Sequence, residues 1–173
     1  GVWAQGGPPV PALDQVANLI RAPLVRQSTD FTCGVAALQS VLAYYGQDSR
    51  DDRLRKALRS RPRYGTHYQD ILKLAVKLGF QAQAYENLTL AQLQGLIDHK
   101  TPPILVIQAW VEGTPDWPND WEDGHYVVAV GYDEDNIYFM DPATIGNYTY
   151  IPIPEFLDRW HDQDRPRKKL YNF

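Results

Sequence analysis

Apolar positions recur with the period of a helix through the first half of the chain. From Thr32 to Gly46 they follow three-and-four spacing, and Gly46 is a natural helix end. The same spacing predicts helices over Asp51–Ser60 and Tyr68–Leu78, and a shorter helix after Thr89, which can cap it. We therefore expect the first half of the chain to be mainly helical.

After Pro102 and Pro103 the pattern changes to short runs of β-branched and aromatic residues separated by turn residues. The predicted strands are Ile104–Trp110, Tyr126–Tyr132, Ile137–Met140 and Tyr148–Ile153, followed by a late helix over Pro154–Trp160. Residues 133–136 form a turn that predicts an antiparallel hairpin. Helices followed by strands indicate an α+β fold, with N-terminal helices packed against a C-terminal antiparallel sheet.

Length and composition fit one globular domain, because the chain has 173 residues, of which 44% are hydrophobic and 22% charged. These values exclude a disordered chain, a collagen-like repeat and a disulfide scaffold. The glycines and prolines among residues 1–11 predict a segment outside the core. We expect an extended lead-in over residues 1–23 and a single domain over residues 24–173.

The formal net charge of −4 gives no general basic field for nucleic acid or an anionic membrane. Seven basic residues lie between Arg50 and Arg63, where a solvated helix face is expected and an anion or partner patch is the alternative. A shorter basic run from Arg165 to Lys169 has the same interpretation. No apolar run reaches the roughly 18 to 20 residues that a membrane span requires.

The N-terminus gives a further indication about localisation. Val2, Trp3 and Ala4 resemble the end of a signal peptide cleaved after Ala4, which favours an exported over a cytoplasmic protein. A truncated or ordinary flexible terminus explains the same residues, so localisation stays open at this point.

The chain contains one cysteine, Cys33, which excludes an internal disulfide and a zinc site built from several thiolates. Its role is packing, intermolecular pairing or chemistry. Cys33 falls in the first turn of a predicted helix, where the helix dipole and unpaired N–H groups favour a thiolate. That position is typical of a nucleophile.

A candidate base and a carboxylate occur in the second half. His125 opens a predicted strand directly after Gly124, and Asp141 ends the next strand. If the hairpin turn is centred near residues 133–134, the two side chains meet at the same end of neighbouring strands. The carboxylate would then orient the imidazole. Gln27, upstream of Cys33, is a candidate donor to an oxyanion.

These residues form a recognisable pattern. The run from Gln27 to Leu38, the Tyr44-Tyr45-Gly46 helix end and the blocks 124–132 and 137–142 together resemble the papain-like cysteine peptidases that process double-glycine leader peptides of bacteriocins, including free-standing relatives. The resemblance runs from about Leu24 to Trp160. It implies a papain-like fold and a bacterial thiol protease that needs no cofactor or metal.

The resemblance also implies a role for each matching residue. Gln27 would belong to the oxyanion hole, Cys33 would be the nucleophile, His125 the general base and Asp141 the residue that orients it. A peptide or protein is the implied substrate, and the acyl-enzyme would pass to water or to another acceptor. The alternative is a non-catalytic peptide-binding or regulatory module that retains the cleft. The oligomeric state is left open.

The resemblance supports the type of reaction more directly than it supports a particular substrate. Family members commonly form the front of a membrane exporter, whereas this chain shows no transmembrane or nucleotide-binding part. Cleavage after a double-glycine leader is therefore only the first candidate. The chain's own Gly6-Gly7 pair is not expected to be a cleavage site, because Pro8 and Pro9 follow it.

An aromatic and acidic stretch over residues 112–123 comes just before His125. We expect it to line or cover the cleft, with Trp121 and Gly124 as substrate-binding residues. Its carboxylates would raise the pKa of His125 or select a basic substrate. A calcium site is the weaker interpretation, because the stretch lacks the ligand pattern of an EF-hand loop, and a solvated surface loop is preferred.

Overall fold

The computed structural model describes residues 13, 16–144, 146–164 and 168–173. The Gly6-Gly7 pair and the signal-like residues Val2 to Ala4 lie outside the described residues, as do Arg165 and Arg167 of the second basic run. Among the residues that are described, no helix is long and apolar enough to cross a bilayer.

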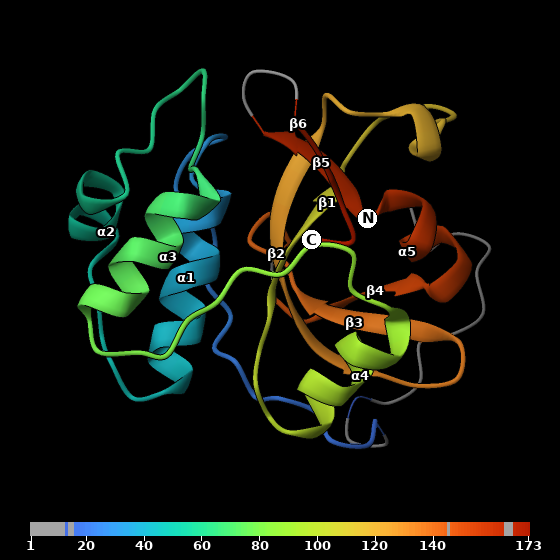
Figure 1. The fold of residues 1–173 in the computed structure, drawn as a ribbon, viewed down its shortest axis with the longest axis horizontal. Coiled ribbons are helices and arrows are strands. Elements are labelled where there is room, and N and C mark those ends of the chain that lie inside the picture. Colours follow the sequence, from blue (N-terminus) through green and yellow to red (C-terminus); the bar gives the residue numbers. More distant parts are fainter. Residues whose placement is uncertain (1–12, 14–15, 145, 165–167) are drawn as a thin grey trace.

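The first half of the chain is helical, as its periodicity predicts. The helices α1 (Cys33–Tyr44), α2 (Asp51–Ala57) and α3 (Tyr68–Lys77) pack together on one side of the molecule (Figure 1). Their apolar positions form a small core of their own, made of Val35, Leu38, Leu42, Leu54, Leu58 and Ile71.

The second half is built around an antiparallel sheet. Its strands are β1 (Ile104–Gln108), β2 (Gly124–Tyr132), β3 (Asn136–Met140) and β4 (Thr149–Pro152), in the order β1-β2-β3-β4. Two more helices, α4 (Leu90–Asp98) and α5 (Ile153–Arg159), pack on this half (Figure 1). The predicted α+β class is thereby confirmed.

The capping residue predicted for α4 is also confirmed. Thr89 accepts a hydrogen bond from the Gln92 backbone N–H, and the Gln92 side chain accepts one from the Thr89 backbone N–H. This reciprocal capping box satisfies two N–H groups that a helix start otherwise leaves unpaired.

Part of the predicted lead-in packs on the sheet. Val16, Leu19 and Ile20 belong to the main hydrophobic core, and the Ile20 N–H donates to the Val130 carbonyl at 2.7 Å. Residues 16–22 therefore contribute to the packed molecule. The boundary at residue 24 stays a prediction.

The sequence pattern does not predict a second sheet, which forms from β5 (His161–Asp164) and β6 (Lys168–Tyr171). It lies against the edge strand β1 (Figure 1). A short 3-10 helix over Trp117–Asn119 also interrupts the stretch before His125. Strand β5 reads His-Asp-Gln-Asp, so it lacks the apolar alternation by which a strand is recognised.

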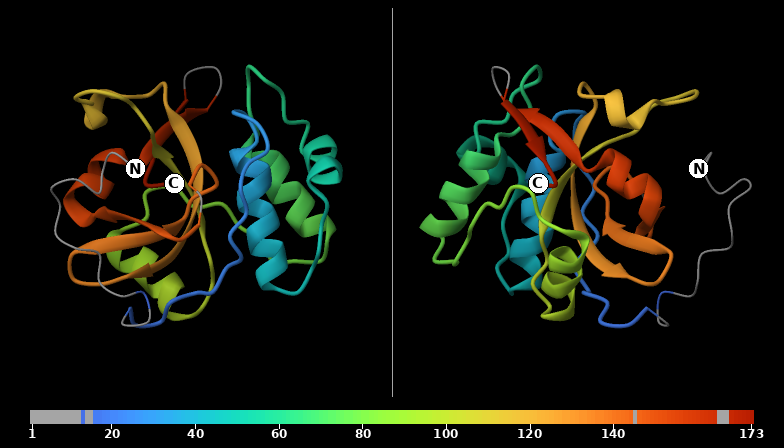
Figure 2. Two further views of the ribbon diagram at one scale, coloured as in Figure 1. Left: turned by 180° about the vertical axis from the view of Figure 1, so that it is seen from behind. Right: turned by 45° about the vertical axis from the view of Figure 1, so that its right-hand side comes forward.

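The helical half meets the sheet where α1 packs against β2 (Figure 2). Gly34 permits this approach, because a Cβ at that position would stand 2.8 Å from the Thr66 Cβ and 3.0 Å from the Tyr126 ring. The contact brings Cys33, the neighbour of Gly34, close to the start of β2.

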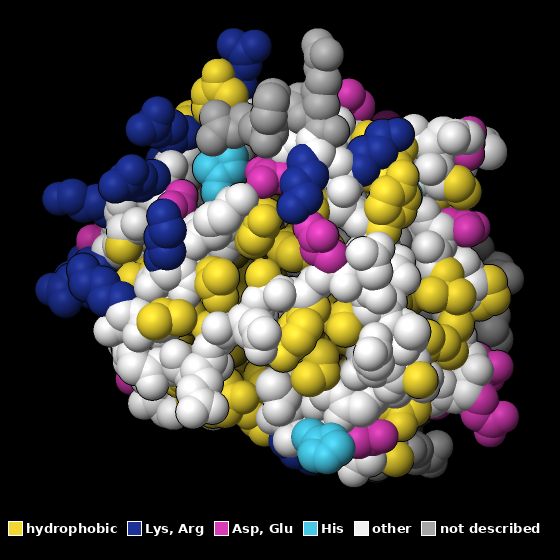
Figure 3. Space-filling view, in the orientation of Figure 1, with side chains coloured by type: hydrophobic (Ala, Val, Ile, Leu, Met, Phe, Trp, Pro, Cys, Tyr) yellow, Lys and Arg dark blue, Asp and Glu magenta, His cyan; other side chains and the backbone are white. Residues whose placement is uncertain are grey.

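The basic stretch between Arg50 and Arg63 forms an exposed face over α2 and the loop that follows it (Figure 3). Arg50 pairs with Asp52 at 3.0 Å, and the Arg55 guanidinium stacks on the Phe31 ring. This arrangement agrees with the solvated helix face expected for the stretch.

Candidate active site

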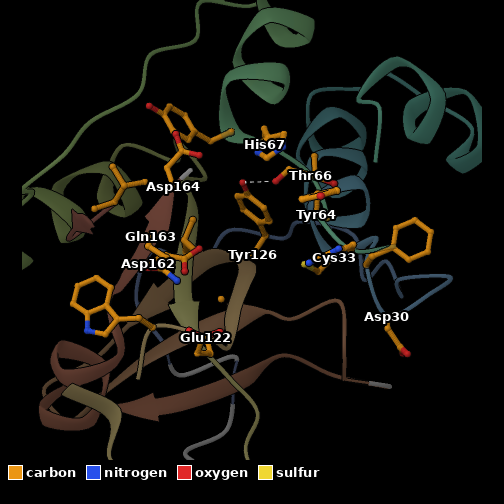
Figure 4. A pocket seen from close by; sticks show the side chains of 18 of the residues that line it. Asp30, Cys33, Tyr64, Thr66, His67, Glu122, Tyr126, Asp162, Gln163 and Asp164 are labelled. Atoms are coloured by element: carbon orange, nitrogen blue, oxygen red, sulfur yellow. Dashed lines mark hydrogen bonds between the residues drawn. The ribbon is translucent and has the colours of Figure 1, made fainter. Parts of the chain in front are cut away.

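Cys33 is the first residue of α1 and lines a cleft of about 760 Å³ between the helical half and the sheet. Figure 4 shows Thr66 and His67 on the side of Cys33, with Asp162 and Gln163 on the opposite wall. The Tyr126 hydroxyl bridges the two sides by donating to the Thr66 carbonyl at 2.8 Å. The cysteine is therefore placed at the wall of a cavity large enough for several peptide residues.

The loop before α1 is held by its own hydrogen bonds. Thr32 is fully buried, and its hydroxyl donates to the Thr29 carbonyl at 3.1 Å and accepts from the Thr29 N–H at 3.0 Å. These contacts fix the backbone that leads into Cys33. The Cys33 N–H is one of the first four of the helix, which have no acceptor within it.

His125 and Asp141 meet as the hairpin predicts. The distance between His125 Nε2 and Asp141 Oδ1 is 2.6 Å, and both residues are buried. Asp141 Oδ1 also accepts from the Ala143 N–H at 2.9 Å, and Oδ2 accepts from the Trp110 indole N–H at 2.9 Å. The carboxylate thus has donors on both oxygens.

The register of the hairpin differs in detail from the prediction. Tyr132 pairs with Ile137, which places the turn between Glu134 and Asp135 rather than at residues 133–134. A register irregularity lies between Ala129 and Gly131. Asp141 therefore stands diagonally across from His125, a separation that long side chains can bridge.

The environment of His125 favours the imidazolium. Burial alone would lower its pKa, but hydrogen bonds to Asp141 and Cys33, together with their negative charges, raise it to about 10. Nε2 faces Asp141, so Nδ1 is the ring nitrogen that the carboxylate does not bind. The acidic stretch was expected to raise this pKa, and that expectation is wrong because Asp141 and Cys33 provide the increase.

Gln27 forms hydrogen bonds both to the segment that follows Asp141 and to the loop that precedes Cys33. Its backbone N–H donates to the carbonyl of Pro142, the residue after Asp141, at 3.0 Å. Its side-chain Nε2 donates to the Thr29 carbonyl at 2.9 Å, while Oε1 is buried without a hydrogen-bond partner among the described residues. The amide is therefore held next to the loop that leads into Cys33.

Trp121 and Gly124 both line the cleft. The Trp121 ring packs on His161, with 4.3 Å between ring centroids, and Trp117 packs on Arg159 instead of entering the cleft. A Cβ at Gly124 would stand 2.5 Å from an oxygen of Asp162, so any other residue here would require the Asp162 side chain to move. The stretch before His125 thus lines the cleft without filling it.

Three residues near the site were not predicted as functional. Asp162 lines the cleft from β5, and burial raises its pKa to about 6. Trp110 and Arg159 lie behind Asp141. None of the three belongs to a sequence motif. They come close to the site only through the packing of β5, α5 and the segment after β1, which the sequence pattern does not predict. Within the described part of the chain, no three His, Cys, Asp or Glu side chains gather as metal ligands.

A cysteine at a helix start, facing a histidine and an aspartate on an antiparallel sheet, is the arrangement of a papain-like cysteine peptidase. Comparison with known proteins gives the same class. Residues 21–163 match the Peptidase C39 family, and the chain belongs to that family of cysteine peptidases.

Individual relatives were found by sequence and by structure. The chain is 31% identical over 135 residues to the transport/processing ATP-binding protein ComA of Streptococcus pneumoniae, a match covering 78% of this chain and 17% of that relative. The chain thus corresponds to a small part of the relative's length.

Two solved structures are each 25% identical to this chain. The peptidase domain of Streptococcus ComA, a bi-functional ABC transporter involved in a quorum sensing pathway, has a TM-score of 0.63 over 80% of this chain and 92% of that chain. A double glycine motif protease from an AMS/PCAT transporter, in complex with the leader peptide, has a TM-score of 0.62 over 82% and 87%. A C39-like peptidase from Bacillus anthracis shares the fold at 20% identity, with a TM-score of 0.66 over 84% and 90%.

Proposed function

We propose that this protein hydrolyses a peptide bond with Cys33 as nucleophile, His125 as acid and base, Asp141 as the residue that orients His125, and Gln27 in the oxyanion hole. The observation that carries the proposal is the buried contact of 2.6 Å between His125 and Asp141, with Cys33 near enough to the same imidazole to raise its pKa. A histidine held charged between a carboxylate and a thiolate is the resting state of a cysteine peptidase.

In the first step the Cys33 thiolate attacks the carbonyl carbon of the substrate, and a C–S bond forms while the carbonyl oxygen becomes negative. The Cys33 N–H and the Gln27 amide are the donors for that oxygen. An amide nitrogen carries two hydrogens, so Gln27 Nε2 keeps one for the substrate while it binds the Thr29 carbonyl. Such donors stabilise charge that develops only in the transition state.

His125 then protonates the leaving amine as the C–N bond breaks, which leaves a thioester on Cys33. The neutral imidazole accepts a proton from water, and the resulting hydroxide attacks the thioester. The C–S bond breaks, the carboxylic acid product leaves, and the thiolate and imidazolium are restored. Asp141 keeps the ring oriented through both steps.

The substrate class that we propose is a peptide cleaved after a double-glycine leader. The support comes from the relatives, one of which is described as a double glycine motif protease in complex with the leader peptide. The cleft of about 760 Å³ beside Cys33 is large enough for an extended peptide segment.

The test is cleavage of two peptides that differ only at the scissile site, one with Gly-Gly and one with Ala-Ala in its place. We expect cleavage after Gly-Gly, slower cleavage of the Ala-Ala peptide, and no cleavage by the Cys33→Ala variant. Cleavage at another sequence in a peptide library would reject the double-glycine substrate but keep the peptidase. Full activity of Cys33→Ala would reject the mechanism.

A further inference from the structure

The carboxylate of Asp141 is held from two sides. Oδ1 faces His125 Nε2 at 2.6 Å, and Oδ2 accepts the indole N–H of Trp110 at 2.9 Å. Asp141 is only 2% exposed, so water has little access to either oxygen. A buried carboxylate oxygen without a donor is unfavourable, which makes the Trp110 hydrogen bond important for holding the carboxylate in place.

Trp110 is itself held by a buried arginine. The guanidinium carbon of Arg159 lies 4.4 Å from the centroid of the Trp110 ring and 4.2 Å from that of Trp117. Arg159 is 2% exposed, and its Nε donates to the Gln108 carbonyl at 2.8 Å. The last residue of α5 is thus placed between two indole rings, a stacking that suits a planar cation.

The charges behind the site alternate. Burial lowers the pKa of Arg159 to about 10, while the negative charges of Glu155 and Asp141 oppose this shift, so the guanidinium is charged at neutral pH. His125 is positive on the other side of Asp141.

We propose that Trp110 is a positioning residue for catalysis, which fixes the Asp141 carboxylate toward His125 through the indole N–H, and that Arg159 holds the Trp110 ring in place. This inference rests on the proposed function, because it needs Asp141 to act on His125. Trp110 does not take part in the chemistry. It acts by keeping the carboxylate from rotating away from His125.

The test is the Trp110→Phe variant, which retains an aromatic ring over Arg159 but lacks the N–H. The readout is the rate at which iodoacetamide alkylates Cys33 as a function of pH, followed by intact mass. We expect alkylation at pH 6 to 7 to be slower than in wild type by about ten- to a hundred-fold, the effect of losing one hydrogen bond to a charged group. The midpoint of the pH profile should also move upward.

Trp117→Phe is the matched control. It makes the same change in a second ring that packs on the Arg159 guanidinium and has no described hydrogen bond to Asp141. We expect its pH profile to equal that of wild type. Equal profiles for Trp110→Phe and wild type would overturn the proposal, as would equal losses in the two tryptophan variants.

A second comparison separates positioning from general destabilisation. In an Asp141→Asn background, Trp110→Phe should cause little additional loss of alkylation rate, because both changes act on one interaction. Additive losses would contradict the proposal. If Trp110→Phe does not fold, Arg159→Lys tests whether Arg159 holds the Trp110 ring in place. A folded Arg159→Lys variant with an unchanged alkylation profile would contradict that role.

The wild-type profile distinguishes the two proposals. An ordinary thiol profile in wild type would reject the proposed catalytic set. A thiolate profile in wild type that Trp110→Phe leaves unchanged would reject only the positioning role.

Discussion

At the scale of single residues, Gln27 offers the most direct test of the oxyanion hole. We expect Gln27→Ala to lower kcat by about a hundred-fold with little change in KM, because the donor acts on charge that is present only in the transition state. Gln39→Ala is the matched control, since the Gln39 side chain donates to the Ser49 carbonyl instead. Equal kinetics for Gln27→Ala and wild type on a cleaved peptide would exclude this role.

Gly34 determines how closely the helix that bears Cys33 approaches the sheet. In Gly34→Ala the new Cβ would stand 2.8 Å from the Thr66 Cβ, which is attached directly to the backbone. We expect the free energy of unfolding in urea to fall by about 1–3 kcal/mol. Alkylation of Cys33 should also slow as α1 shifts.

Gly95→Ala is the control for that substitution. Gly95 lies within α4, and a Cβ there meets nothing within 4 Å. We expect this variant to be more stable than wild type by about 0.5–1 kcal/mol, because alanine loses less backbone entropy in a helix. If Gly34→Ala and Gly95→Ala lost the same amount of stability, the close contact of Gly34 with Thr66 would not explain the loss in Gly34→Ala.

At the scale of elements, the β5–β6 hairpin places a carboxylate in the cleft wall. Burial is the main cause that raises the pKa of Asp162 to about 6, while hydrogen bonds from the Gln163 backbone and the Gln108 side chain lower it. The folded protein therefore binds this proton more tightly than the unfolded chain. The resulting loss of stability begins near the unfolded pKa of about 3.9, grows as the pH rises, and is complete above about pH 6.

We therefore expect Asp162→Asn to be more stable than wild type at pH 7, by up to about 3 kcal/mol, and equal to it near pH 4. Urea unfolding at the two pH values measures the difference. Asp158→Asn, on an exposed position of α5, is the control and should show no such pH-dependent gain. A gain for Asp162→Asn that is the same at pH 4 and pH 7 would contradict this explanation.

The elements with a strong periodic pattern could be predicted from the sequence. The helix starting at Cys33 and the hairpin between His125 and Asp141 follow from local spacing, but it is the irregularity between Ala129 and Gly131 that puts Asp141 on the same face of the sheet as His125. The exact register could not be predicted, because the irregularity at residues 129–131 leaves no mark in the pattern.

Other features depend on packing between distant segments. Strand β5 is polar along most of its length and is defined by its pairing with β6 and its contact with β1. Arg159 resembles an ordinary charged residue at a helix end, yet it is buried between Trp110 and Trp117. The support behind Asp141 therefore becomes visible only in the folded molecule.

At the scale of the whole molecule, the candidate site joins two separately packed halves. The helical half supplies Cys33 through α1, the sheet supplies His125 and Asp141, and Gln27 lies on the segment between the halves with its backbone bound to Pro142. Each half has its own hydrophobic core. The geometry at Cys33 consequently depends on how α1 is seated against β2.

The central claim is that Cys33 is a thiolate paired with the His125 imidazolium. The most direct measurement is the rate of Cys33 alkylation by iodoacetamide against pH, in wild type and in His125→Ala, with intact mass as the readout. The account predicts fast alkylation that persists well below pH 8 in wild type and is lost in the variant. Slow alkylation that follows an ordinary thiol pKa of about 8.5 in both proteins would contradict it.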